Sequence, residues 1–233
     1  MKKNKLSYLL LHIIFPERCR FCGKVIRLNT EYCEECRDTV HVIGSPVCNF
    51  CGSEKKLCTC KKAKRFYDGV TAPYYYEGPA AKCIKRLKFN EKLKNADFLA
   101  DKMYSALKNN CEAAKFDLLC CVPMSAHERK SRGYNQSELI AKALSKRMGI
   151  PFEKEMLKKI YDTKSQRTLS SHERSGNLIG VFESEDATGK TVLLCDDVKT
   201  TGASLNECAK MLKLAGADRV WCVVAACSQT KEK

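Results

Sequence analysis

Three short runs of the chain are almost continuously apolar: FDLLCCV at 116–122, VLLC at 192–195 and RVWCVVAA at 219–226. Runs of this length, rich in residues that favour strands, are typical of strands covered on both faces in a parallel sheet. Tyr74–Tyr76 predicts a further strand, and the turn Glu77–Pro79 follows it. The pattern therefore predicts a sheet with its core strands in the second half of the chain.

Stretches with helical periodicity separate these runs. Residues 80–88 and 96–109 form two of them, and a third ends near Met148, with Gly149 as its C-cap. A fourth covers about 203–215, between the last two apolar runs. A strand, a helix and a second strand in this order form a right-handed crossover. We therefore expect an α/β domain with a parallel sheet over residues 65–233.

The amino-terminal stretch Leu6–Phe15 is apolar and follows a Lys-rich start. It is far shorter than the roughly 20 residues that a membrane span requires, and it lacks the small-residue cleavage site of a secretory signal. We expect residues 1–15 to form a short amphipathic helix that packs on the following module. Docking to a membrane surface or to a partner is the alternative.

Residues 16–64 are predicted to form a double zinc ribbon. Cys-x-x-Cys pairs turn two thiolates toward one point, and two such pairs complete a tetrahedral zinc site. The last pair is one residue shorter than usual, so the two sites either follow one another in tandem, which we favour, or interleave their pairs. Sites made only of thiolates are closed to water and therefore structural. The eight predicted ligands are Cys19, Cys22, Cys33, Cys36, Cys48, Cys51, Cys58 and Cys60.

The chain has 16 cysteines, and the other eight are scattered through predicted strands and helices. Lone cysteines there act as small hydrophobic residues, and both uses indicate a reducing, cytoplasmic location. Lys and Arg number 42 against 27 acidic residues, a net charge of +15. Two zinc tetrathiolates would lower this balance to about +11. The charge favours polyanionic ligands, although most of these lysines are expected on solvated helix faces.

The stretch from Val192 to Ser204 carries the strongest chemical signal. Its apolar run is followed by two carboxylates, Asp196 and Asp197, and ligands of parallel sheets bind beyond the carboxyl ends of the strands. A turn opened by glycine comes next and offers backbone N–H groups, hydroxyls and the positive end of a helix, which together suit a phosphate. Its residues are Lys199, Thr200, Thr201, Gly202, Ala203 and Ser204.

A second loop follows the 116–122 run and comprises Pro123, Met124, Ser125 and Ala126. Cationic residues, including Arg132, crowd directly after it, and a helix begins soon afterwards. A loop at a strand end, backed by cations and a helix start, is an arrangement that binds pyrophosphate. A plain basic turn is the alternative from this loop alone.

The stretch 192–204 resembles the phosphoribosyl diphosphate (PRPP) motif of type I phosphoribosyltransferases: four apolar residues, Asp-Asp, and Thr-Thr-Gly-Ala-Ser. The resemblance implies that the two aspartates hold the ribose hydroxyls, directly or through Mg²⁺. It further implies that the 200–204 turn binds the 5′-phosphate and that Pro123–Ala126 binds the pyrophosphate. It also implies a type I phosphoribosyltransferase-like parallel sheet.

Further blocks narrow the resemblance to the ComF family of bacterial competence (DNA-uptake) proteins. These are Arg132-Gly-Tyr-Asn-Gln136, then Gln166-x-x-Leu169, then Glu173-Arg174-x-x-Asn177, with the Cys-x-x-Cys pairs ahead of them. The likeness covers nearly the whole chain. In related transferases a flexible hood closes over PRPP, which gives the polar stretch 162–177 that expected role, with Arg174 as a cation for the pyrophosphate.

The sequence leaves two functions open. The first is a protein that binds PRPP with Mg²⁺ and transfers or senses phosphoribosyl groups in DNA uptake. The second is a non-catalytic competence adaptor that binds single-stranded DNA or a helicase-type partner through its ribbons and a basic face. That face would include the stripe Lys82, Lys85, Arg86 and Lys88, whose other interpretation is a solvated helix face.

Overall fold

The computed structural model describes residues 16–60, 65–87, 92–111, 115–160 and 181–229. Its main sheet is parallel throughout, with the strand order β1-β7-β6-β3, and β2 also pairs with β7. The α/β class and the parallel sheet are thereby confirmed. The strands are β1 (Gly69–Thr71), β2 (Tyr74–Tyr75), β3 (Leu118–Cys121), β6 (Thr191–Lys199) and β7 (Arg219–Cys227).

The three apolar runs form β3, β6 and β7, as predicted. The prediction that the second run ends as a strand at Cys195 is wrong, because β6 stays paired with β7 through Asp196 and on to Lys199. The acidic pair thus lies inside the end of a strand. Strand β1 was not predicted, since it is short and begins at a glycine that lies opposite Trp221.

Four helices lie close to the predicted positions, whereas α2 (Glu34–Thr39) and α5 (Ala126–Arg132) were not predicted. Helix α6 ends at Gly149, which has the left-handed backbone (φ 68°) expected of a C-cap glycine. The helices are α2 (Glu34–Thr39), α3 (Gly78–Arg86), α4 (Lys92–Asn110), α5 (Ala126–Arg132), α6 (Gln136–Met148) and α8 (Ala203–Leu214). Two 3-10 turns, η1 (Lys55–Leu57) and η2 (Lys154–Met156), and the antiparallel hairpin β4 (Leu157–Lys159) with β5 (Phe182–Ser184) complete the described elements.

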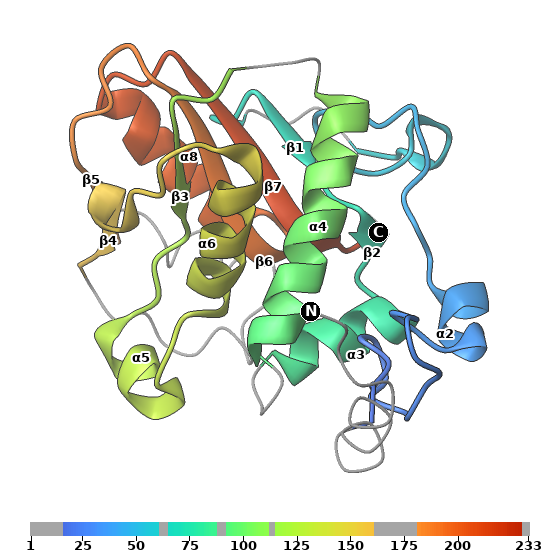
Figure 1. Ribbon diagram of the computed structural model, residues 1–233. Helices are drawn as coiled ribbons and strands as arrows, with labels where there is room; N and C mark the ends of the chain where they lie inside the picture. Colours follow the sequence, from blue (N-terminus) through green and yellow to red (C-terminus); the bar gives the residue numbers. More distant parts are fainter. Residues whose placement is uncertain (1–15, 61–64, 88–91, 112–114, 161–180, 230–233) are drawn as a thin grey trace.

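Two apolar layers sandwich the sheet. Helices α4 and α6 lie on one face and α8 lies on the other (Figure 1). The first four-cysteine module packs with α3 and α4 through Phe21, whereas the segment leading to the second module packs on the α8 face through Ile43 and Val47. The two cysteine modules therefore contact opposite faces of one sheet.

Both edges of the sheet are covered by non-strand segments. On the β2 side, Ile43 N–H donates to Pro73 O at 2.9 Å and Tyr75 N–H donates to His41 O at 3.0 Å. On the β3 side, Leu119 N–H donates to Pro151 O at 2.9 Å and its carbonyl accepts from Glu153 N–H at 2.8 Å. These contacts satisfy backbone groups that an open edge would leave to solvent.

The expected amino-terminal helix (1–15) and the expected hood (162–177, with Arg174) lie outside the described residues. Within the described part of the chain, no helix is long and apolar enough to cross a membrane.

Candidate functional site

The two loops predicted to bind the ligand lie side by side. Strands β3 and β6 are parallel neighbours, with Cys121 opposite Cys195, and Val122 N–H donates to Cys195 O at 3.0 Å. Because parallel strands end at the same edge, Pro123 and the following loop lie next to Asp196 and Asp197. The register thus brings together two segments that are more than 70 residues apart in the sequence.

Asp196 is held in a defined orientation. Its Oδ1 accepts a hydrogen bond from Ser137 Oγ at 2.7 Å and another from Asp197 N–H at 2.9 Å. Burial, followed by the neighbouring charge of Asp197, raises the pKa of Asp196 to about 8. Two adjacent carboxylates repel each other when both are ionised, so a cation or hydroxyl donors bound beside them stabilise the pair.

The turn from β6 into α8 has the form of an anion site. Gly202 takes the left-handed conformation (φ 79°) and is the N-cap of α8, yet no side chain caps the helix. Thr201 Oγ1 accepts from Ala203 N–H at 3.3 Å, which shapes the turn, and Thr200 is exposed. The remaining first-turn N–H groups and the positive helix end are the features that bind phosphate.

Lys199 differs from the other residues of the predicted phosphate loop, because its side chain is buried beneath the turn. It is the last residue of β6, its side chain is only 3% exposed, and it extends beneath the turn into the α8 face of the sheet.

The second loop, Pro123 to Ala126, leads directly into a helix. Ser125 is the N-cap of α5: its hydroxyl accepts from Glu128 N–H at 3.1 Å, and its own N–H donates to the Glu128 carboxylate at 3.5 Å. The basic residues that follow this loop belong to α5, a helix that was not predicted and that ends at Arg132. Its Ser-x-x-Glu spacing is the capping-box signature and could have revealed the helix.

Three residues at the start of α6 support the site and were not singled out from the sequence for this purpose. Asn135 Nδ2 donates to Val122 O at 3.0 Å, and Ser137 reaches Asp196. Between them, Gln136 is buried, and its Nε2 has no hydrogen-bond partner in the described structure. No sequence signal indicates the Ser137 contact, because it depends on how α6 packs against β6.

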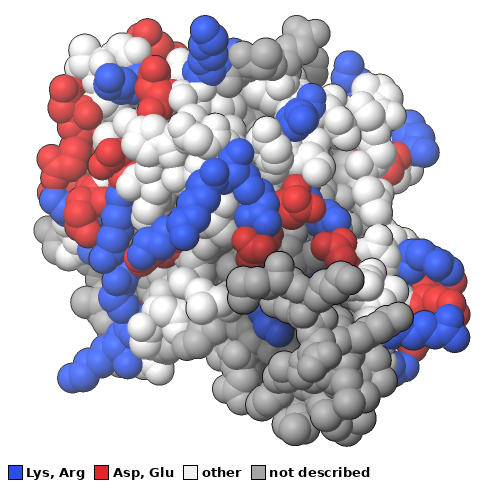
Figure 2. All heavy atoms as spheres, viewed as in Figure 1, with Lys and Arg blue, Asp and Glu red and all other residues white. Residues whose placement is uncertain are grey.

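Charges near this edge are mostly paired. Glu138 accepts from Arg129 at 2.7 Å and from Lys142 at 2.8 Å. Burial raises the pKa of Glu138, but the hydrogen bonds from the two cations outweigh it and leave the pKa lowered. Over α4 and α6, basic and acidic side chains lie close together (Figure 2), as in the 2.7 Å pair of Arg147 with Asp97. This face is thus not uniformly basic.

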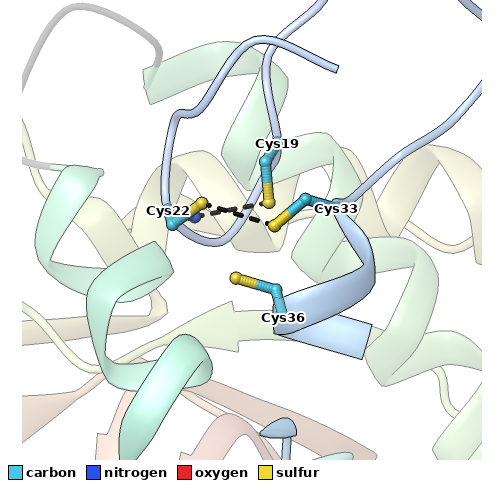
Figure 3. A group of neighbouring side chains, drawn as sticks. All are labelled: Cys19, Cys22, Cys33 and Cys36. Atoms are coloured by element: carbon cyan, nitrogen blue, oxygen red, sulfur yellow. Dashed lines mark hydrogen bonds between the residues drawn. The ribbon is translucent and has the colours of Figure 1, made fainter. Parts of the chain in front are cut away.

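The first cysteine group comes from a knuckle loop and from the start of α2 (Figure 3). Cys19, Cys22, Cys33 and Cys36 place their sulfur atoms within 4.8 Å of one another, and Cys22 and Cys33 are 3.7 Å apart. Four thiolates around zinc at a bond length of about 2.3 Å lie roughly 3.8 Å apart. The geometry therefore fits a zinc ion.

The second group has the same geometry. Cys48, Cys51, Cys58 and Cys60 also lie within 4.8 Å of one another, with sulfur separations that include 3.5 and 4.0 Å. The pairs are thus grouped in tandem, and the short Cys58-Thr-Cys60 pair serves as a knuckle. A backbone hydrogen bond from Cys60 is the main cause that lowers the pKa of Cys58 to about 7, which suits a thiolate ligand.

Part of the predicted basic stripe is structural. Arg86 is half-buried and its Nη1 donates to Cys19 O at 3.0 Å, which ties α3 to the first cysteine group. Lys82 and Lys85 are exposed, and Lys88 lies outside the described residues. Placing Arg86 on a free basic face is therefore wrong.

The fold and these two cysteine groups define a class of protein: a type I phosphoribosyltransferase-like α/β domain joined to a double zinc ribbon. Family models support both parts. The double zinc ribbon domain matches residues 10–66, and the phosphoribosyl transferase domain matches residues 135–233.

Relatives match over most of the chain. Competence protein F of Haemophilus influenzae is 29% identical, over 88% of this chain and 95% of the relative. DNA utilization protein YhgH of Escherichia coli K12 is 25% identical over 88% of each chain, and competence protein ComFC of Streptococcus pneumoniae is 25% identical over 87% and 96%. The resemblance to the ComF family is thereby confirmed.

Solved structures give weaker matches. The glutamine PRPP amidotransferase of B. subtilis is 20% identical, covers 55% of this chain and 25% of its own, and has a TM-score of 0.38. A purine phosphoribosyltransferase of Pyrococcus horikoshii is 20% identical, covers 55% and 69%, and has a TM-score of 0.34.

Proposed function

We propose that this protein binds PRPP together with Mg²⁺ at the carboxyl ends of β3 and β6, and that it acts in DNA uptake by transferring or sensing phosphoribosyl groups. The observation that carries the proposal is the junction of an acid pair and an uncapped, glycine-opened helix start. A sugar phosphate satisfies both: its hydroxyls or its metal meet the acids, and its phosphate meets the helix.

Asp196 and Asp197 supply oxygen ligands, which Mg²⁺ prefers. Burial and the charge of Asp197 disfavour the ionised form of Asp196, and a bound cation would favour it. Mg²⁺ would neutralise charge on the pyrophosphate as it leaves. Ser137 and Asp197 N–H fix the Asp196 carboxylate, so its second oxygen is oriented for the ligand.

The 5′-phosphate is assigned to the turn formed by Thr200, Thr201 and Gly202 and to the first residues of α8, Ala203 and Ser204. The pyrophosphate is assigned to the loop of Pro123, Met124, Ser125 and Ala126, with Arg132 and Arg174 as cations. Such preset donors stabilise charge as it develops, because they need no reorganisation.

The test is calorimetric titration of PRPP with Mg²⁺ into the zinc-loaded protein. Asp197→Asn should abolish binding, since it removes one of the paired charges. Asp218→Asn is the matched control: it makes the same change on an exposed residue just before β7, far from the site, and should bind like the parent. Equal binding by both variants would refute the site, and a parent that does not bind would refute the function.

A second candidate function, the competence adaptor that binds single-stranded DNA, is favoured by the names of the relatives and by the net charge of +15. Because Arg86 supports the first cysteine group, the test should change only Lys82 and Lys85. Their joint replacement by Gln should lower the slope of log affinity against log salt by about 1.4 and leave PRPP binding unchanged. An unchanged slope would exclude this face as the DNA site.

A further inference from the structure

We propose that the second zinc cluster supports the phosphate-binding turn through Lys199, which acts as a positioning residue rather than a phosphate ligand. The proposal rests on the proposed function for its phosphate turn, but its link to zinc can be tested separately.

Lys199 connects the turn to the second cluster. In the sheet it lies opposite Cys227, and the Cys227 thiol donates to Gly52 O at 3.7 Å. Gly52 directly follows the ligand Cys51. The backbone of Lys199 is also fixed, because its carbonyl accepts from Ser228 N–H at 2.8 Å. Lys199 is thus connected to a zinc knuckle through its neighbour in the sheet, Cys227.

Lys199 also lies directly under the turn. A methyl group placed on Gly202 would lie 3.2 Å from Lys199 Cε and 3.6 Å from the Tyr67 hydroxyl. Tyr67 in turn donates to Phe50 O at 3.3 Å, within the Cys48–Cys51 knuckle. The side chains of Tyr67 and Lys199 therefore form the floor of the turn: Tyr67 contacts the knuckle directly and Lys199 is connected to it through Cys227, so a shift of the knuckle would affect both.

The charge of Lys199 lies in a poorly hydrated place. The residue is only 3% exposed, and no ion pair or side-chain hydrogen bond of its ammonium group is found among the described residues. Burial, the largest effect, and the nearby Arg65 guanidinium both lower its pKa, whereas Cys227 and Cys51 act in the opposite direction. A buried ammonium is costly without a compensating anion. A zinc tetrathiolate carries a net charge of −2 and supplies one.

Arg65 adds a second cation at the same place. Its guanidinium lies over the rings of Phe50 and Tyr67, 5.6 and 6.0 Å from their centroids. Two cations thus adjoin the second cluster from the side of the phosphate turn. The first cluster packs on the opposite face with α3 and α4. Zinc bound to the first cluster should therefore be unaffected by a change at Lys199, which makes the first cluster an internal control.

Zinc release into a chromogenic chelator tests the link without any ligand. Lys199→Met keeps the side-chain length and removes the charge, so one zinc ion should leave roughly tenfold faster while the other leaves at the parental rate. Lys199→Arg should restore slow release. Cys58→Ser identifies the affected phase as that of the second cluster. Parental release of both ions from Lys199→Met would overturn the proposal, as would equal acceleration of both.

PRPP titration tests the second link. Cys58→Ser should weaken binding by about tenfold or more, whereas Cys33→Ser in the first cluster should change it by about twofold or less. Equal weakening by the two variants would overturn the coupling to the turn. If the parent does not bind PRPP, the proposed function fails, and the zinc-release result alone decides whether Lys199 serves the second cluster.

Discussion

Replacing Phe21 by Ala should destabilise the whole protein, although Phe21 belongs to the first zinc ribbon. Its side chain is 1% exposed and makes edge contacts with Tyr74 at 5.6 Å and with Phe98 of α4 at 5.3 Å. Truncating a buried Phe costs about 3–5 kcal/mol, and its aromatic pairs place this site in the upper part of that range. The reason is that the ring is shared by the ribbon and the layer that covers the sheet.

Urea unfolding followed by the fluorescence of Trp221 measures this effect at a distance. Trp221 is the only tryptophan, lies in β7 and is 3% exposed, so it reports on the sheet rather than on the ribbon. With a slope of about 2–3 kcal/mol/M, a loss of about 4–5 kcal/mol should lower the midpoint by roughly 1.3–2.5 M. Phe21→Leu should give a smaller shift in the same direction and keeps the test informative if Phe21→Ala does not fold.

Leu28→Ala is the matched control, because Leu28 lies in the same ribbon but is 38% exposed. It should move the midpoint little. If Phe21→Ala releases zinc faster but leaves the Trp221 transition unchanged, the ribbon unfolds on its own and the reasoning about a shared core is refuted.

Three further outcomes are expected. Glu138→Gln should lower stability by about 1–2 kcal/mol at neutral pH. The folded state lowers the pKa of Glu138, so the stability difference between parent and variant should be complete above pH 4.5, the ordinary pKa of Glu, and should shrink as the pH falls below it. Urea midpoints at several pH values measure this difference. A difference that does not change with pH would contradict the reasoning. Gly69→Ala should cost more than about 2 kcal/mol, since its methyl group would lie 2.3 Å from the Trp221 ring; a thermal midpoint equal to that of the parent would refute the contact. Chelating both zinc ions should lower the thermal midpoint of the Trp221 signal, and an unchanged midpoint would show that the clusters do not support the sheet.

The sheet could be predicted where packing dictates composition. Strands β3 and β7 and the 192–195 part of β6 are covered on both faces, so nearly every position there is apolar and the sequence signal is strong. Strand β1 is only three residues long and starts at Gly69, so it leaves no periodic pattern. Its place follows from pairing with β7, which local sequence does not encode.

The candidate site was predictable to a similar degree. Asp196, Asp197 and the turn from Thr200 to Ser204 follow from motif spacing. The position of Lys199 does not, because it depends on β6 continuing through the acid pair, and strand continuation is set by the partner β7. The contact of Ser137 with Asp196 likewise needs the packed helix. Motif spacing thus indicated the candidate residues, and the tertiary structure shows the contacts that hold them.

The covered edges of the sheet restrict how this protein associates with others. A strand added beside β2 or β3 would have to displace the segments around Ile43 and Pro151, which already occupy hydrogen-bonding groups there. Side-chain surfaces are therefore the favoured contacts for a second copy or another protein. Substitutions that loosen either covering segment should show their effect as aggregation rather than as a loss of ligand binding.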